Sequence, residues 1–331
     1  MLSRVLVLLT ALCLAAATAV VTGEGLPRRA EAAQQPVLAA HNDTSTPFNL
    51  VHLPQLARTR LDGRGLELRP VAQEGGVVHH AVSYRGAGLT LTGTLTRPDR
   101  AGRFPLVVLA HGYHHPSAYD PAQVSRRERV YLASRGFVVL QPDYRNYGGS
   151  TREDDRFVAR PTGYPEDLLN AVRALRRADL SFVRRGAAHL FGRSMGGGVA
   201  LQAAVARPAW FRSVVLASPI SSRAADTFSR WAEPGTPLRR AVVEAYGLPR
   251  DNPVFWRQAS VRRHLQRLEV PVHVHHGVRD DVCPVAWSRR TVRAVHRSGG
   301  RARLHTYDGA EHTFHDRDWT VMMRRAVAAY R

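Results

Sequence analysis

The sequence of 331 residues contains no lysine, so its formal net charge of +20 comes from arginine. The absence of lysine excludes Schiff-base chemistry and every mechanism in which a lysine activates a serine. A strongly basic surface attracts nucleic acid and anionic envelope polymers. Because no zinc-finger spacing and no interleaving of aromatic and basic residues accompanies the charge, we expect no nucleic-acid partner. A loose association with an anionic cell envelope stays open.

Cysteine is also scarce, since only Cys13 and Cys283 occur. Cys13 lies within a short basic start and an apolar run, residues 5–21, which together are typical of a secretory signal with small residues near Ala19 for cleavage. We therefore expect residues 1–23 to be a signal peptide or an uncleaved anchor, and the protein to be secreted or associated with the cell envelope. Removal of the signal leaves one thiol and no internal disulfide.

The remaining chain changes character near residue 76. Residues 24–75 show no clear periodicity, which predicts a linker and an irregular N-terminal segment. Two alternating segments, 80–84 and 89–95, flank a glycine-containing turn and predict an antiparallel hairpin. From there to residue 331, buried strand patterns alternate with helical ones, except across 221–268, which is rich in Arg, Trp and Pro. We expect 76–331 to be the catalytic domain and 221–268 its cap.

The alternation predicts the order of the elements. Strands are expected at 105–110, 137–140, 187–191, 214–217, 270–276 and 301–307, and helices at 121–134, 166–177, 239–246, 286–297 and 318–330, with a further helix after residue 195. This order indicates an α/β fold with a mostly parallel central sheet, an antiparallel hairpin at its N-terminal side, helices on both faces and a small cap insertion. Ligands bind such sheets at the carboxyl ends of the strands.

One of these expected strand ends carries the pattern Gly-x-Ser-x-Gly, at Gly192 to Gly196. Glycines on either side of the serine let a strained strand-to-helix turn lift its hydroxyl clear of the sheet. The short apolar strand before this turn and the Ala-rich segment after it provide the context that the pattern needs. We therefore predict that Ser194 is a nucleophile.

A serine needs a base and a group that orients the base, in the chain order Ser, acid, His on this fold. Asp280 follows one strand and His312 follows the next, and we assign them as the orienting acid and the general base. Asp281 stays open as an alternative acid and His315 as an alternative base. His276, at a strand end, is expected to be a packed or turn-stabilising histidine.

Acyl transfer also needs donors for the developing oxyanion. The backbone N–H of Met195, after the nucleophile, is one, and we nominate Tyr113, in the loop after the first parallel strand, as the other. The histidines His111, His114, His115, His273 and His275 are expected to be structural or at the rim, because no carboxylate completes a familiar ligand set. No metal or cofactor is therefore expected. A structural turn is also favoured for Asp143.

With these residues placed, the chain from about residue 80 to 331 resembles the α/β-hydrolase superfamily. More narrowly, it is similar to the catalytic domain of the prolyl oligopeptidase family and to acylaminoacyl-peptidase-like and dienelactone-hydrolase-like proteins. The resemblance is carried by the segments 111–113, 142–149, 192–197, 276–280 and 311–312. It implies a triad of Ser194, Asp280 and His312, with Tyr113 and Met195 as the oxyanion hole.

The peptidases of that family usually carry a β-propeller before the catalytic domain, and here about fifty irregular residues stand between the expected signal and the hairpin. We therefore expect a serine hydrolase of small ester or peptide substrates, with esterase activity favoured on model substrates. A catalytically idle protein that binds anionic envelope polymers is the alternative, although every triad position is filled. The sequence does not name the oligomeric state.

Overall fold

A computed structural model describes residues 53–153 and 163–331. The expected signal and most of the expected linker lie outside the described residues. The strands are β1 (Arg64–Glu74), β2 (Val77–Gly86), β3 (Leu89–Pro98), β4 (Leu106–Ala110), β5 (Val138–Pro142), β6 (Ala188–Arg193), β7 (Phe211–Ala217), β8 (Val272–Gly277) and β9 (Ala302–Tyr307). The helices are α1 (Leu53–Arg58), α2 (Arg126–Ala133), α3 (Gly163–Ala178), α4 (Met195–Ala206), α5 (Ala224–Trp231), α6 (Pro237–Tyr246), α7 (Pro253–Gln258), α8 (Val285–Arg297) and α9 (Asp316–Tyr330), with 3₁₀ turns η3 (Pro116–Ala118), η4 (Pro208–Trp210) and η5 (Val261–Arg267).

Within the described residues the strands form one mixed sheet in the order β1-β2-β3-β5-β4-β6-β7-β8-β9. The block from β5 to β9 is parallel, whereas β1, β2, β3 and β5 pair antiparallel in succession. The central parallel strands are continuous apolar runs because helices cover both of their faces. The predicted α/β fold with a mostly parallel sheet is therefore confirmed.

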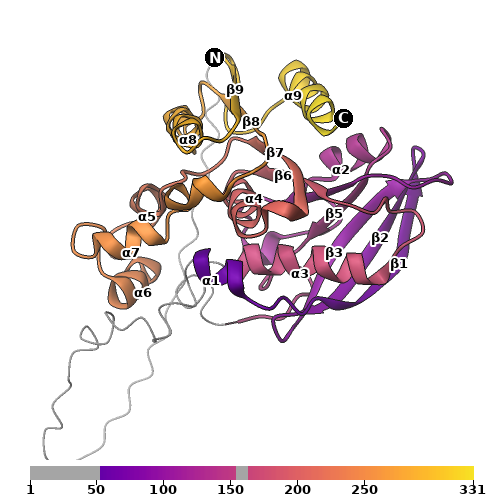
Figure 1. The fold of residues 1–331 in the computed structure, drawn as a ribbon, viewed down its shortest axis with the longest axis horizontal. Coiled ribbons are helices and arrows are strands. Elements are labelled where there is room, and N and C mark those ends of the chain that lie inside the picture. The colour runs from indigo at the N-terminus through magenta and orange to yellow at the C-terminus, as the bar shows by residue number, and fades with distance from the viewer. Residues whose placement is uncertain (1–52, 154–162) are drawn as a thin grey trace, which may run out of the picture. The chain divides into compact units, whose positions relative to one another are not determined.

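Side chains of the central strands alternate between two cores. Val108 and Leu190 pack in the larger core with α1, α3, α4 and α8, whereas Val107 and Phe191 pack in the second core with α2 and α9. Figure 1 shows the two helices of the second core on the opposite side of the sheet from α3 and α4. The period of two along each strand thus distributes its residues between the two layers.

Two expectations differ from the structure. Residues 64–74, expected to be irregular, form the edge strand β1, in which Leu66 and Leu68 pack on the core and the other side chains are exposed, so its apolar alternation is short. The helix expected from residue 121 begins at Arg126, because Asp120 accepts a hydrogen bond from the amide of Ala122 in a preceding turn and Ser125 has a φ of 52°.

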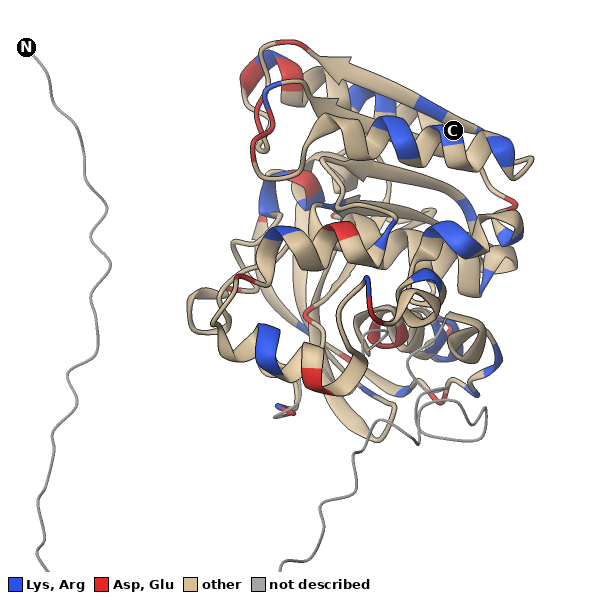
Figure 2. Ribbon diagram, turned by 90° about the vertical axis from the view of Figure 1, so that its left-hand side faces the viewer, with Lys and Arg blue, Asp and Glu red and all other residues tan. Residues whose placement is uncertain are grey.

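Residues 221–268 fold into α5, α6, α7 and η5, inserted between β7 and β8. Phe228, Val242, Phe255 and Trp256 form a small apolar cluster of their own there. Arginines lie on several helices of the molecule and are not confined to one element (Figure 2). Among the described residues no helix is long and apolar enough to cross a membrane.

Candidate active site

The strand-to-helix turn after β6 holds Ser194 in a conformation that few non-glycine residues adopt, with φ 54° and ψ −122°. Two close approaches explain the surrounding glycines. A Cβ on Gly196 would lie 2.0 Å from the carbonyl oxygen of Ala110, and one on Gly112 would lie 3.3 Å from the Cβ of Ser194. The turn therefore brings the hydroxyl against the loop that follows β4.

The loop after β9 brings an imidazole to this hydroxyl, and the loop after β8 places a carboxylate against the imidazole. The Nε2 atom of His312 lies 3.0 Å from Oγ of Ser194, and its Nδ1 atom lies 2.9 Å from Oδ2 of Asp280. The side chain of Asp280 is fully buried, and that of His312 is 17% exposed. The three residues form one continuous hydrogen-bonded chain from carboxylate to hydroxyl, in the geometry that activates a serine.

The carboxylate of Asp280 is held by further donors. The amides of Val282 and Cys283 donate to Oδ1 at 3.0 and 2.8 Å. The Nε2 atom of His276 lies 3.1 Å from Oδ2. Burial alone would raise the pKa of Asp280, but the hydrogen bonds from His276, His312 and the Cys283 amide hold it well below its ordinary value. The group is therefore ionised at neutral pH.

The alternatives to these residues lie elsewhere. The side chain of Asp281 is exposed and only its backbone oxygen is engaged, by Arg230. His315 is exposed at the start of α9 and has no contact with Ser194. His276 is buried as expected, with Nδ1 2.6 Å from Oγ of Ser288.

Two backbone amides stand near the hydroxyl. Met195 is the first residue of α4, so its N–H has no partner within the helix. Tyr113 follows Gly112, the residue that packs against Ser194, and its side chain is exposed. The assignment of these two amides as oxyanion donors stays a prediction.

Cys283 is a neighbour that sequence reasoning did not place. Its fully buried thiol lies beside Ser194, a contact that tends to lower its pKa, yet burial raises the pKa to about 12. The thiol is therefore neutral and unreactive as a nucleophile at physiological pH. In the sequence, the only feature that indicates a place near the site for Cys283 is its position three residues after Asp280, and that position does not indicate a chemical role.

The loop after β5 packs against His111, which directly follows β4 and precedes Gly112 of the site. The buried ring of His111 contacts the carbonyl oxygen of Asp143 through Nε2 at 3.0 Å and stacks on Tyr144. Burial lowers the pKa of His111 to about 4, so the ring is neutral. The carboxylate of Asp143 accepts hydrogen bonds from Thr92 at 2.6 Å and Tyr119 at 2.7 Å. Asp143 is thus structural, but it links its loop to Thr92 of β3 and to Tyr119 instead of capping its own turn.

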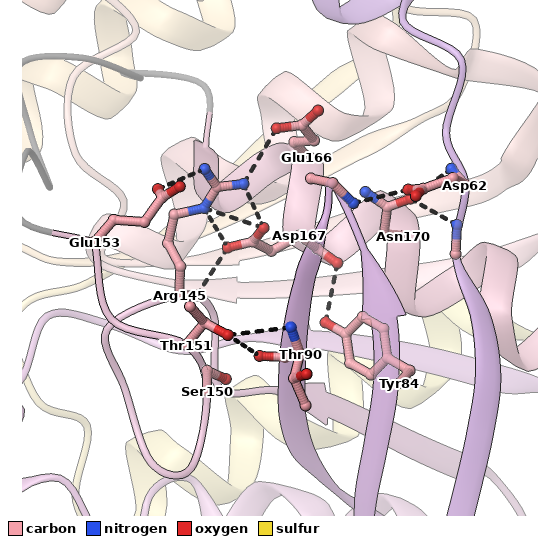
Figure 3. Close-up of polar contacts among 12 residues, drawn as sticks. Asp62, Tyr84, Thr90, Arg145, Ser150, Thr151, Glu153, Glu166, Asp167 and Asn170 are labelled. Carbon is pink, nitrogen blue, oxygen red and sulfur yellow. Dashed lines mark hydrogen bonds and ion pairs between the residues drawn. The ribbon is translucent and has the colours of Figure 1, made fainter.

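A buried arginine fixes the same loop (Figure 3). Arg145 donates to Asp167 at 2.7 Å, to Glu153 at 2.9 Å and to Glu166 at 3.1 Å, and its side chain is 2% exposed. Burial alone would lower the pKa of Arg145, but hydrogen bonds to Asp167 and the charges of the glutamates raise it. The ion pairs tie the loop to α3.

No group of three or more His, Cys, Asp or Glu side chains in the described part of the chain is arranged to hold a metal ion. His111 and His114 lie instead in an aromatic cluster with Tyr119. His273 and His275 stack against His305 across β8 and β9.

Comparison with known proteins identifies the family and the fold. The model of the prolyl oligopeptidase family matches residues 122–330. An uncharacterized protein of Mycobacterium tuberculosis is 32% identical over 209 residues, which are 63% of this chain and 64% of that protein, so the chain matches somewhat less than two thirds of its length.

Two solved structures illustrate the fold. Acetyl xylan esterase 1 from a Thermoanaerobacterium species superimposes with a TM-score of 0.63 at 18% identity, over 86% of this chain and 93% of that one. The acylaminoacyl peptidase of Pyrococcus horikoshii superimposes with a TM-score of 0.57 at 18% identity, over 75% and 38%. The chain belongs to the prolyl oligopeptidase family and has the α/β-hydrolase fold.

Proposed function

We propose that the protein hydrolyses small esters or peptide bonds through an acyl-enzyme on Ser194, with His312 as general base and Asp280 as the orienting acid. The observation that carries the proposal is the continuous chain of hydrogen bonds from Asp280 through His312 to Ser194. In the absence of such a base a serine hydroxyl is a poor nucleophile at neutral pH.

The proposed reaction has two halves. Oγ of Ser194 attacks the carbonyl carbon while its proton passes to Nε2 of His312, and the amides of Met195 and Tyr113 donate to the oxyanion. When the tetrahedral intermediate collapses, His312 protonates the leaving alcohol or amine. Water then attacks the acyl-enzyme as His312 accepts its proton, and collapse of the second tetrahedral intermediate releases the acid as His312 returns the proton to Oγ of Ser194.

We favour an ester as the bond cleaved. The matched esterase structure is covered over almost its whole length, whereas the matched peptidase is covered over 38%. We further propose that the protein is exported, since residues 5–21 form an apolar run after a basic start, and that its arginine-rich surface associates loosely with an anionic envelope.

A substrate panel tests the proposal. Purified protein is assayed with p-nitrophenyl esters of increasing acyl length and with aminoacyl p-nitroanilides, alongside Ser194→Ala as the background control. We expect turnover of the esters that Ser194→Ala lacks. Turnover of anilides alone would assign the peptide bond, and equal turnover by both proteins would place the nucleophile elsewhere.

A further inference from the structure

A cavity of about 180 Å³ lies next to the candidate triad on the side of the sheet covered by α2 and α9. Arg193, the residue before Ser194, and Thr313, the residue after His312, both line it. Arg126, Arg127 and Glu128, from the first turn of α2, line it as well. The cavity therefore has three arginines and one carboxylate in its wall.

Arg193 stands out among these groups because it forms no ion pair with any described residue. Its guanidinium donates to Oγ1 of Thr313 at 2.6 Å. Burial lowers the pKa of Arg193, yet a guanidinium keeps its charge in proteins. The charges of Glu128 and Asp280 favour the charged guanidinium but form no ion pair with it, so a bound anion would supply the direct partner that this partly buried charge lacks.

The other charged groups of the cavity already have partners. Arg126 pairs with Glu74. Arg127 stacks over Trp319 at 4.1 Å and donates to the carbonyl oxygen of Phe314 at 2.8 Å. Glu128 accepts from Nε1 of Trp319 at 2.7 Å and lies 3.8 Å from Nε of Arg127. Glu128 is thus directed to Trp319 and Arg127, and no ion pair joins it to Arg193.

We propose that this cavity binds a small oxyanion, a carboxylate or a phosphate group, with Arg193 as its main partner. The planar guanidinium matches both groups, and its N–H donors that do not reach Thr313 are available to pair with two oxygens at once. The anion comes either from the substrate, which would make the enzyme selective for esters carrying a free carboxylate, or from a separate small anion. Only the first source rests on the proposed function.

Binding is tested without any assay of activity. Wild type, Arg193→Gln and, as a matched loss of one charge, exposed Arg212→Gln are titrated with inorganic phosphate by isothermal calorimetry at constant ionic strength. We expect saturable binding that Arg193→Gln weakens about tenfold or more and Arg212→Gln leaves unchanged. Thr313→Val, which keeps the guanidinium, is expected to retain binding. Absence of saturable binding to the wild type, or equal binding by Arg193→Gln, would overturn the proposal.

A second measurement identifies the source of the anion. If the substrate supplies it, Arg193→Gln lowers kcat/KM about tenfold more for the p-nitrophenyl monoester of succinate than for p-nitrophenyl butyrate, and phosphate competes with the succinate ester. If a separate anion binds, phosphate changes turnover of both esters alike. Both results support the cavity as an anion site. Ser194→Ala is expected to bind phosphate normally, so failure of the proposed nucleophile leaves this test intact.

Discussion

Asp143 and Asp280 both lie just beyond the carboxyl ends of buried parallel strands, yet their surroundings differ. Asp280 meets two histidines and two backbone amides, and its pKa lies well below the ordinary value. The carboxylate of Asp143 accepts hydrogen bonds from Thr92 and Tyr119, yet burial raises its pKa to about 6 in spite of these bonds and of the charge of Arg129. A carboxylate at a strand end can therefore have its pKa lowered or raised, depending on the donors around it.

The two loops also differ in what lies beyond the carboxylate. His312 links Asp280 by hydrogen bonds to the hydroxyl of Ser194, which lies on a strained and partly exposed turn. The loop that begins at Asp143 carries Arg145 instead, and three carboxylates pair with its buried guanidinium. One loop faces the proposed nucleophile, and the other is tied to α3 by ion pairs.

The largest effect is expected from removal of the Ser194 hydroxyl, which ends the hydrogen-bonded series Asp280–His312–Ser194. Ser194→Ala is expected to lower kcat by about 10⁶-fold, because the acyl-enzyme can no longer form. Steady-state assays with the best ester of the panel measure it. Far-ultraviolet circular dichroism serves as the control for folding, and a folded variant with more than a few per cent of wild-type turnover would show that Ser194 is not the nucleophile.

The next effect concerns the acid. Asp280→Asn is expected to lower kcat by about 10⁴-fold, because the amide favours the wrong tautomer of His312. Asp281→Asn is the matched control and is expected to stay within about threefold of wild type, since surface substitutions have small effects. A severe loss confined to Asp281→Asn would reverse the assignment.

Arg145→Met tests the ion pairs that tie the Asp143 loop to α3. We expect it to lower the free energy of unfolding by about 3–5 kcal/mol, because it leaves buried Asp167 without its cation. Urea denaturation measures the change. Arg185→Met breaks the exposed pair with Asp179 and is expected to cost far less, because solvent screens exposed ion pairs. Equal costs for the two variants would mean that burial does not distinguish the pairs.

The smallest effect is the pH dependence that Asp143 contributes. Its folded pKa of about 6 lies above the ordinary 3.8, so the folded protein binds the extra proton between these values and loses stability as the pH rises through them. The stability of Asp143→Asn relative to wild type is therefore expected to rise by up to about 3 kcal/mol from pH 4 to pH 7.

For Asp280→Asn, the stability relative to wild type is expected to change with pH in the opposite direction. The pKa of Asp280 is lowered in the folded protein, so its stabilisation is present above about pH 3.8 and lost as the pH falls. Relative to wild type, Asp280→Asn is expected to lose stability from pH 3 to pH 5. Urea denaturation at each pH measures both variants. If their free energies of unfolding relative to wild type changed with pH in the same direction, the two carboxylates would not differ as described.

The sequence was informative where local pattern decides the structure. The strands that precede Ser194 and Asp280 were predicted within a few residues from their short apolar segments, although His189 interrupts β6 and three histidines interrupt β8. The chain order of nucleophile, acid and base then limited the candidates, and the structure brings Ser194 and His312 together across 118 residues.

Contacts between distant polar side chains could not be predicted. Nothing local to Arg145 indicates that Asp167 will neutralise it, and nothing local to Arg193 indicates Thr313, because these pairs form only when separate loops pack together. The edge strand β1 was missed for a related reason. Its partner β2 and α3 stabilise it, and its own apolar alternation is short.

The central claim is that Ser194 is an activated nucleophile, and labelling with a fluorophosphonate probe tests it most directly. Intact-mass and peptide analysis of the wild-type protein is expected to show one adduct, on Ser194, and none in Ser194→Ala. Asp280→Asn is expected to label far more slowly. A folded wild-type protein that stays unlabelled would contradict the account and favour an idle hydrolase fold that binds anionic polymers.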